Sequence, residues 1–246
     1  MATDTVTVTD TMRRSFREQG YVVIPGVLTD AQLARGRALV ERQLAADPAP
    51  PGHLGHLARW PRFTDTGPNP LLEFYREAGV ARLAAQLLRA DLPPLEPDFA
   101  QVAVTIPPWP HRPGGPHLDG LTPMPADGLP GTFSLLAGVW LSDQSAPHHG
   151  NLWVWPGTHL RAGAYFAKHG PDAITRVDEL GPGPYPAVDL GEPAQAMGPA
   201  GSVLFAHYLL AHNRRPQTTA RPTRRGAARS TTGSLPSGTG GAGARS

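Results

Sequence analysis

The sequence contains no cysteine and no long hydrophobic run, and each absence excludes a class of protein. Without cysteine there is no disulfide framework, no thiolate nucleophile and no cysteine-ligated zinc or iron–sulfur cluster. Any bound metal must therefore be held by histidine, aspartate or glutamate. No stretch of about twenty apolar residues occurs, so we expect no membrane-spanning helix and no membrane partner. Residues 1–12 lack the apolar core of a signal peptide, and we expect a cytoplasmic protein.

Charged residues are also scarce, at 17% of the 246, and they are unevenly placed. Seven arginines and no acidic residue follow Asn213, so the preceding part holds 15 basic and 20 acidic residues. The basic character thus belongs to the C-terminal segment. Its arginines are sparse after Arg225, and no aromatic side chain lies among them for base stacking, so we expect no nucleic-acid partner.

Proline and glycine are abundant, with 29 and 28 residues, which favours many turns and short strands over a helical bundle. Helical patterns dominate the first third of the chain, where Gly20 ends one helix and a capping box of Thr29 and Gln32 opens another. The expected elements there are a helix at 10–19, a strand at 21–24, a helix from 30 to about 46, a loop at 47–66 and helical segments over 71–88 with a break near 79. On the second helix we expect Leu33, Gly36, Val40 and Leu44 to form the packed face.

Strand patterns dominate the rest of the chain, beginning with an apolar alternation from Ala100 to Ile106. Further strands are expected at 117–119, 134–142, 151–155, 187–190 and 202–210. The fold class is therefore α+β, mainly β, with a sandwich or small barrel. Residues 226–246 contain Leu235 as their only bulky apolar side chain, and we expect this tail to be disordered.

The strongest chemical signal is the tripeptide from His117 to Asp119. Residues i and i+2 of a strand point to the same face, so an imidazole and a carboxylate would project together. With a distant histidine they would form the two-histidine, one-carboxylate triad typical of non-haem Fe(II), which leaves one face of the metal open. A loop histidine beside a solvated aspartate is the alternative interpretation of this short motif.

Four motifs in order resemble the phytanoyl-CoA dioxygenase (PhyH-like) family of Fe(II)/2-oxoglutarate oxygenases. They are the segment 20–29 (GYVVIPGVLT), His117 with Asp119, the segment 150–159 (GNLWVWPGTH) and the strand that opens at Gly201 and ends in L-x-H at His212. The resemblance implies a double-stranded β-helix (jelly-roll) core over about 98–225. A helical part at about 10–90 would pack outside it, within a single domain of residues 1–225.

The same resemblance implies Fe(II), 2-oxoglutarate and O2, with iron on His117, Asp119 and a distal histidine. His207 and His212 are both candidates, and they would face opposite ways on a regular strand because they are five residues apart. The family places its ligand eleven residues after Gly201, which selects His212. Halogenating relatives replace the carboxylate with a small residue, so the retained Asp119 favours hydroxylation or another oxidation over halogenation. The expected reaction is hydroxylation of an unactivated C–H bond of a small molecule, in secondary metabolism for example.

The far carboxylate of 2-oxoglutarate calls for an arginine, because a guanidinium matches a carboxylate in geometry and charge. The family's offset from the distal histidine falls on Thr223, which Arg221 and Arg224 flank, with Arg225 next to them. Gln101 resembles a family position that touches the co-substrate, although a polar residue at a strand edge would explain it equally.

The chain departs from the family after Leu210, where no strand rich in valine, tyrosine and phenylalanine follows. Our hypothesis is that a frameshift or divergence has removed the last strand of the barrel. Two alternatives to an active hydroxylase therefore stay open: a catalytically impaired member with a damaged C-terminus, and a cupin-like metal-binding isomerase on the same fold.

Overall fold

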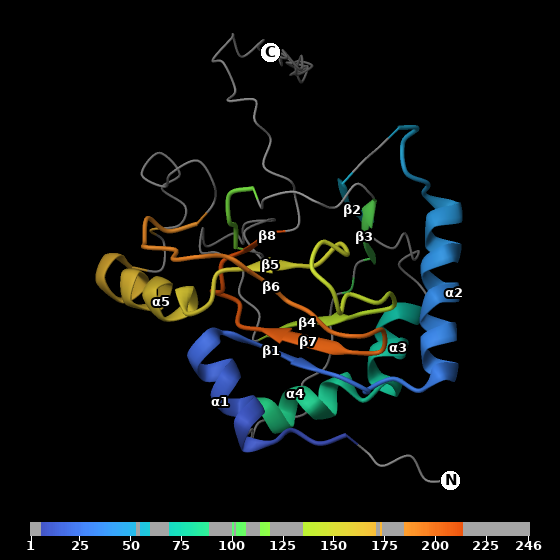
Figure 1. The fold of residues 1–246 in the computed structure, drawn as a ribbon, viewed down its shortest axis with the longest axis horizontal. Coiled ribbons are helices and arrows are strands. Elements are labelled where there is room, and N and C mark those ends of the chain that lie inside the picture. Colours follow the sequence, from blue (N-terminus) through green and yellow to red (C-terminus); the bar gives the residue numbers. More distant parts are fainter. Residues whose placement is uncertain are drawn as a thin grey trace, which may run out of the picture.

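A computed structural model gives the fold, with helices and antiparallel strands (Figure 1). It describes residues 6–52, 55–59, 69–88, 100, 102–106, 114–118, 135–170, 173 and 185–213. The helices are α1 (Asp10–Gln19), α2 (Asp30–Ala46), α3 (Pro70–Glu77), α4 (Val80–Leu88) and α5 (Thr158–His169). The strands are β1 (Tyr21–Ile24), β2 (Gly55–Arg59), β3 (Val102–Ile106), β4 (Leu136–Val139), β5 (Trp153–Val154), β6 (Ala194–Gln195), β7 (Val203–Ala206) and β8 (His212–Asn213). The expected disordered tail lies outside the described residues.

Strand β7 is the centre of the molecule. It lies between β1 and β4 in one antiparallel sheet, and a second sheet has the order β6-β5-β8. Val203 and Phe205 of β7 pack with residues of α1 and α4, whereas Leu204 and Ala206 pack with residues of β5 and β6. Neighbouring residues of a strand point to opposite faces, so β7 is buried from both sides.

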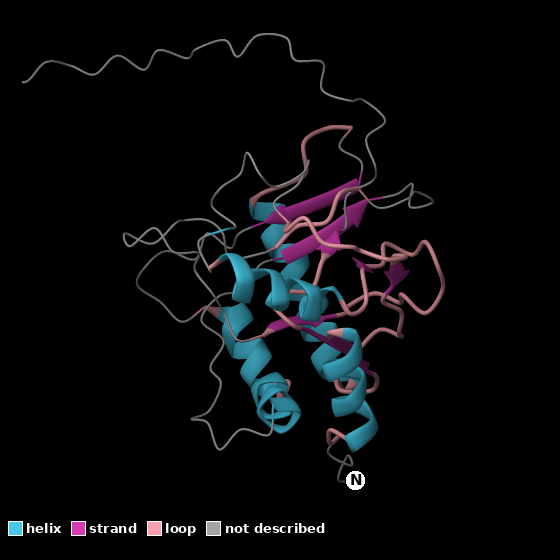
Figure 2. Cartoon of the chain, turned by 90° about the vertical axis from the view of Figure 1, so that its left-hand side faces the viewer, coloured by secondary structure: helices cyan, strands magenta, loops and turns pink. Residues whose placement is uncertain are grey.

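The helices and the second sheet thus lie on opposite faces of the β1-β7-β4 sheet. Figure 1 shows α1 and α4 below that sheet and β5, β6 and β8 above it, and Figure 2, seen from the end where α5 lies, shows the helices against the strands. A third pair, β2 and β3, stands apart as a two-stranded sheet near α2. The expected α+β class is confirmed at the level of helices packed with antiparallel sheets. Among the described helices, none is both long and apolar enough to cross a membrane.

The locally encoded elements have the predicted bounds. Gly20 ends α1 with φ +83°, and its N–H donates to the Phe16 carbonyl at 2.8 Å. Thr29 and Gln32 form the capping box of α2, with each side chain accepting from the other residue's backbone N–H. The predicted break between the two helical segments of 71–88 occurs at Gly79, which has φ +71°.

Several other predictions were wrong. The expected loop 47–66 contains β2, which pairs with β3 from Gly55↔Ile106 to Arg59↔Val102. The expected strand at 187–190 is a bend in which the Asp189 side chain accepts the Gly191 N–H, and β6 lies a few residues later. Residues 158–169, given no helix in the prediction, form α5.

Three predicted strands or faces also need correction. The strand expected at 202–210 ends at Ala206 because the chain turns, with the Leu210 N–H donating to the His207 carbonyl at 2.9 Å. His117 forms an isolated bridge instead of part of a strand. On α2 the fully buried positions are Gly36, Leu39 and Gln43, while Leu33, Val40 and Leu44 are only partly buried.

The end of α1 is fastened to the start of α5. The His159 Nε2–H donates to the Arg17 carbonyl at 3.0 Å, and the imidazole lies directly over Gly20. His159 is buried, and burial lowers the pKa of its ring, which keeps the ring neutral. This contact joins the first and third motifs, which begin 130 residues apart in the chain.

We predict that Gly20→Ala destabilises the protein more than Gly26→Ala. Both glycines have positive φ, at +83° and +67°, so either alanine costs about 1 kcal/mol of backbone strain. A Cβ at Gly20 would lie 2.5 Å from His159 Nδ1, whereas nothing lies within 4 Å of one at Gly26. Overpacking adds about 1–3 kcal/mol at Gly20 alone. Urea unfolding measures both free energies, and equal losses would contradict the contact.

Candidate metal centre

Two histidines from distant parts of the chain lie side by side. His117 and His212 form an antiparallel bridge in which the His117 N–H donates to the His212 carbonyl at 3.2 Å. Their ring centroids are 4.5 Å apart with an angle of 50° between the planes. Side chains of directly opposed antiparallel residues project to the same face. Two imidazole nitrogens can therefore approach one metal ion.

The backbone around this pair is fixed by a second set of contacts. β8 pairs with β5, with Val154 opposite His212 and Trp153 opposite Asn213. The Asn213 side-chain amide donates to the Gly115 carbonyl, two residues before His117. Asn213 thereby ties the His117 segment to β8. Asn213 could not be predicted as part of the site, because only its neighbour His212 belongs to a recognisable pattern.

The orientation of the His212 ring suits a metal. Its Nδ1 lies 2.9 Å from the Leu210 carbonyl oxygen, and a carbonyl can only accept, so Nδ1 carries the proton. In the neutral ring Nε2 then holds the lone pair that a metal requires, as is usual for histidine ligands. The side chain is 6% exposed. The donor set thus fits Fe(II), which accepts imidazole nitrogen.

The remaining candidate ligands fall on residues that the structure does not describe. Asp119, Gln101, Arg221 and Arg224 are all among these, as is Arg225. Within the described ranges no group of three or more metal-binding side chains occurs. The third iron ligand and the 2-oxoglutarate contacts accordingly stay predictions.

His207, the other candidate distal ligand, lies against different neighbours. Its ring centroid is 5.2 Å from that of His159, and its backbone N–H donates to the Gly20 carbonyl at 2.8 Å. Its Nδ1 accepts the Leu209 N–H at 3.1 Å. The turn after Ala206 separates the two candidates, so that His212 stands beside His117 and His207 beside α1.

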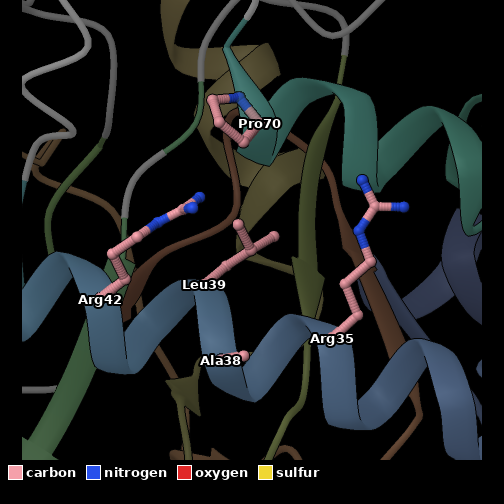
Figure 3. A pocket seen from close by; sticks show the side chains of 5 residues that line it. All are labelled: Arg35, Ala38, Leu39, Arg42 and Pro70. Carbon is pink, nitrogen blue, oxygen red and sulfur yellow. The ribbon is translucent and has the colours of Figure 1, made fainter.

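A cavity of about 290 Å³ lies elsewhere, on α2 (Figure 3). Arg35 and Arg42 flank Leu39 along the helix, and Pro70 of α3 lies opposite. Arg35 forms an ion pair with Glu77. Neither His117 nor His212, the two candidate ligands that the structure describes, lines this cavity, and Figure 1 shows α2 at the edge of the molecule, away from β8.

We predict a loss of stability in acid that depends on His207. Burial, reinforced by the neighbouring His159, lowers the pKa of His207 from 6.5 to about 4. The unfolded chain therefore binds the proton first, and the stability due to the neutral ring is complete above pH 6.5 and is lost as the pH falls toward 4. His207→Gln should reduce the change in the free energy of unfolding between pH 6.5 and pH 4, as measured by urea unfolding. His149→Gln, at an exposed position, should leave it unchanged, and an unaltered slope in His207→Gln would contradict the assignment.

Comparison with known proteins places the chain in a family. The family model for phytanoyl-CoA dioxygenase (PhyH) matches residues 16–226, a span that includes all the predicted ligands. No curated protein matches the chain. Among solved structures, the non-heme alpha-ketoglutarate-dependent carbocyclase SnoK from nogalamycin biosynthesis is 22% identical, with 86% of this chain and 79% of that one covered and a TM-score of 0.57.

The epimerase SnoN from the same biosynthesis, also described as non-heme and alpha-ketoglutarate dependent, is 22% identical. The match covers 85% of this chain and 75% of SnoN, with a TM-score of 0.54. These two likenesses show a shared fold. Fe(II), 2-oxoglutarate and O2, which the motifs implied, are the cofactor and co-substrates of the matched family. The chain belongs to the phytanoyl-CoA dioxygenase family.

Proposed function

We propose that the protein is an Fe(II)/2-oxoglutarate-dependent dioxygenase that hydroxylates an unactivated C–H bond of a small molecule. The observation that carries the proposal is the pair of adjacent imidazoles of His117 and His212, with the His212 tautomer that has its lone pair on Nε2. Membership of the family supports the same conclusion. The proposal includes a single domain over residues 1–225 with a jelly-roll core from about residue 98. The two facing antiparallel sheets support that core.

In this proposal His117, Asp119 and His212 hold the iron. Asp119 is two residues after His117, so an extended backbone would direct its carboxylate to the side on which the two imidazoles lie. Three ligands on one face leave the opposite face open to a chelating co-substrate and O2. When bound, the iron supplies O2 activation coupled to the decarboxylation of 2-oxoglutarate to succinate. His212 is buried, and so is Leu118, the residue after His117.

The arginines after Asn213 would bind the co-substrate. Arg221 or Arg224 would pair with its far carboxylate, and Gln101 would add an amide contact. The family match supports this assignment because it continues to residue 226. Retention of Asp119 favours hydroxylation over halogenation. The two solved structures that share the fold are named for other reactions, as a carbocyclase and an epimerase, so the reaction outcome needs its own test.

An impaired enzyme is the second candidate, and one observation favours it. The segment after Asn213 contains no apolar strand pattern, and arginine, proline and glycine are frequent there instead. Such a protein would bind Fe(II) without coupling 2-oxoglutarate decay to a product. A cupin-like isomerase would bind metal and be indifferent to both 2-oxoglutarate and O2.

We predict that the apo-protein, given Fe(II) and 2-oxoglutarate without oxygen, develops the visible iron-to-2-oxoglutarate charge-transfer band. His117→Ala, Asp119→Ala and His212→Ala should each abolish it, because each removes a ligand. His207→Gln should retain it, since that ring lies against His159. Absorption spectroscopy measures the band in all five proteins.

The outcomes separate the candidates. Iron binding without the band would indicate a lost co-substrate anchor and hence the impaired enzyme. A band that survives in His212→Ala would contradict the ligand assignment. With a band present, oxygen-dependent succinate release identifies substrates, and incorporation of one atom from ¹⁸O2 into the product distinguishes hydroxylation from cyclisation or epimerisation.

A further inference from the structure

We propose that the buried hydroxyls of Thr158 and Tyr185 are positioning groups for His212, acting through the backbone of the turn at residues 207–211. The inference rests on the proposed function, in which His212 binds iron. Neither residue carries a predicted role in that function. Both act on the turn from outside it, one from the start of α5 and one from the segment before β6.

The turn matters because it contains the group that orients the ligand. The Leu210 carbonyl accepts the Nδ1–H of His212 and thereby selects the nitrogen that faces a metal. Leu210 is fully buried and is held within the turn by its own N–H, which donates to the His207 carbonyl. A displacement of this carbonyl would therefore change both the tilt of the imidazole and the position of its proton.

Thr158 holds the residue on the C-terminal side of Leu210. Its Oγ1 accepts the Ala211 N–H at 3.0 Å and donates to the Trp155 carbonyl at 2.6 Å. The Ala211 carbonyl in turn accepts the Trp155 N–H at 2.9 Å. Thr158 and Ala211 are both 0% exposed, so water cannot replace the hydroxyl when it is removed. Both polar groups of Ala211 are thus bound to one short stretch of chain.

Tyr185 holds the residue on the N-terminal side. Its hydroxyl donates to the Leu209 carbonyl at 2.6 Å, and the side chain is 4% exposed. Burial raises the pKa of Tyr185 to about 12, so the phenol remains a donor at any working pH. Its ring belongs to the apolar cluster that includes Leu118, the residue after His117. Tyr185 therefore bonds to the turn before His212 and shares an apolar cluster with the residue after His117.

Ser202 supplies a matched control for a loss of stability alone. It is 0% exposed like Thr158, and its hydroxyl donates to the carbonyl three residues earlier, that of Pro199, at 2.7 Å. Thr158 makes the corresponding bond to Trp155. Ser202 stands at the opposite end of β7 from the turn, so Ser202→Ala removes a hydroxyl of the same kind without touching the backbone that orients His212.

The test compares metal affinity and imidazole tautomer in the apo-protein. We expect Thr158→Val and Tyr185→Phe to weaken Co(II) binding by about tenfold or more, the range typical for outer-shell partners of a metal ligand. Thr158→Ser and Ser202→Ala should bind Co(II) as the wild-type chain does. Nitrogen-15 NMR of the rings should show the His212 Nδ1–H form in the wild type and a mixture of tautomers in Thr158→Val. Tyr185→Phe retains the buried ring, so this variant can test the inference if Thr158→Val does not fold.

The inference would be overturned if Thr158→Val and Tyr185→Phe bind Co(II) as tightly as Ser202→Ala does. It would also be overturned if all three variants lose Co(II) affinity equally. An unchanged His212 tautomer in both hydroxyl variants would overturn it as well. If the wild-type chain binds no Co(II), the proposed function fails, and the tautomer measurement decides the positioning role by itself.

Discussion

The orientation of the candidate metal centre depends on one hydrogen bond, from the His212 imidazole to the Leu210 carbonyl. That carbonyl cannot move freely, since residues on both sides of it are bound to buried groups and the turn follows directly from β7. β7 in turn is fixed from both faces, by helices on one and by the second sheet on the other. The position of the His212 ring is thus fixed by backbone contacts that begin at the buried strand β7.

The described histidines show how environment divides one residue type among several roles. His159 donates to a backbone carbonyl through Nε2 and packs over a glycine, so its role is to join two helices. His207 accepts a backbone N–H and stays neutral within a mostly apolar setting. Only His117 and His212 stand opposite each other on paired backbone. The bonding of each ring, more than its burial, separates the structural histidines from the candidate ligands.

Local signals explain what could be predicted from the sequence. The capping box of Thr29 and the positive φ of Gly20 are set by neighbouring residues, and the elements they bound were predicted correctly. Helix α5 was missed because Gly157 opens it without a side-chain cap, and β6 and β8 are too short for any periodicity. Strand β2 exists through its pairing with β3, which no local pattern in a proline- and glycine-rich stretch could indicate.

In the candidate site, too, residues with a local pattern could be predicted and residues that act through long-range contacts could not. The H-x-D motif and the family spacing pointed to His117 and His212, and the structure lays these two together. The prediction that His207 and His212 lie on one regular strand and face opposite ways was wrong, because a turn separates them. Asn213 and Tyr185 carried no signal, and Thr158 stood in a family motif without an assigned role, since their contacts join segments distant in the chain. Such residues are found only when the backbone groups they bind are known.

The pairing of β1 with β7 has a consequence for how the chain acquires its structure. Tyr21 is opposite Ala206 and Ile24 is opposite Val203, so the central sheet unites the two ends of the described chain. During synthesis β1 must wait, with its apolar face unprotected, until β7 has left the ribosome. Contacts of such high sequence separation slow folding and expose intermediates to aggregation. His212 follows β7 in the chain, so the imidazole pair also forms late in synthesis.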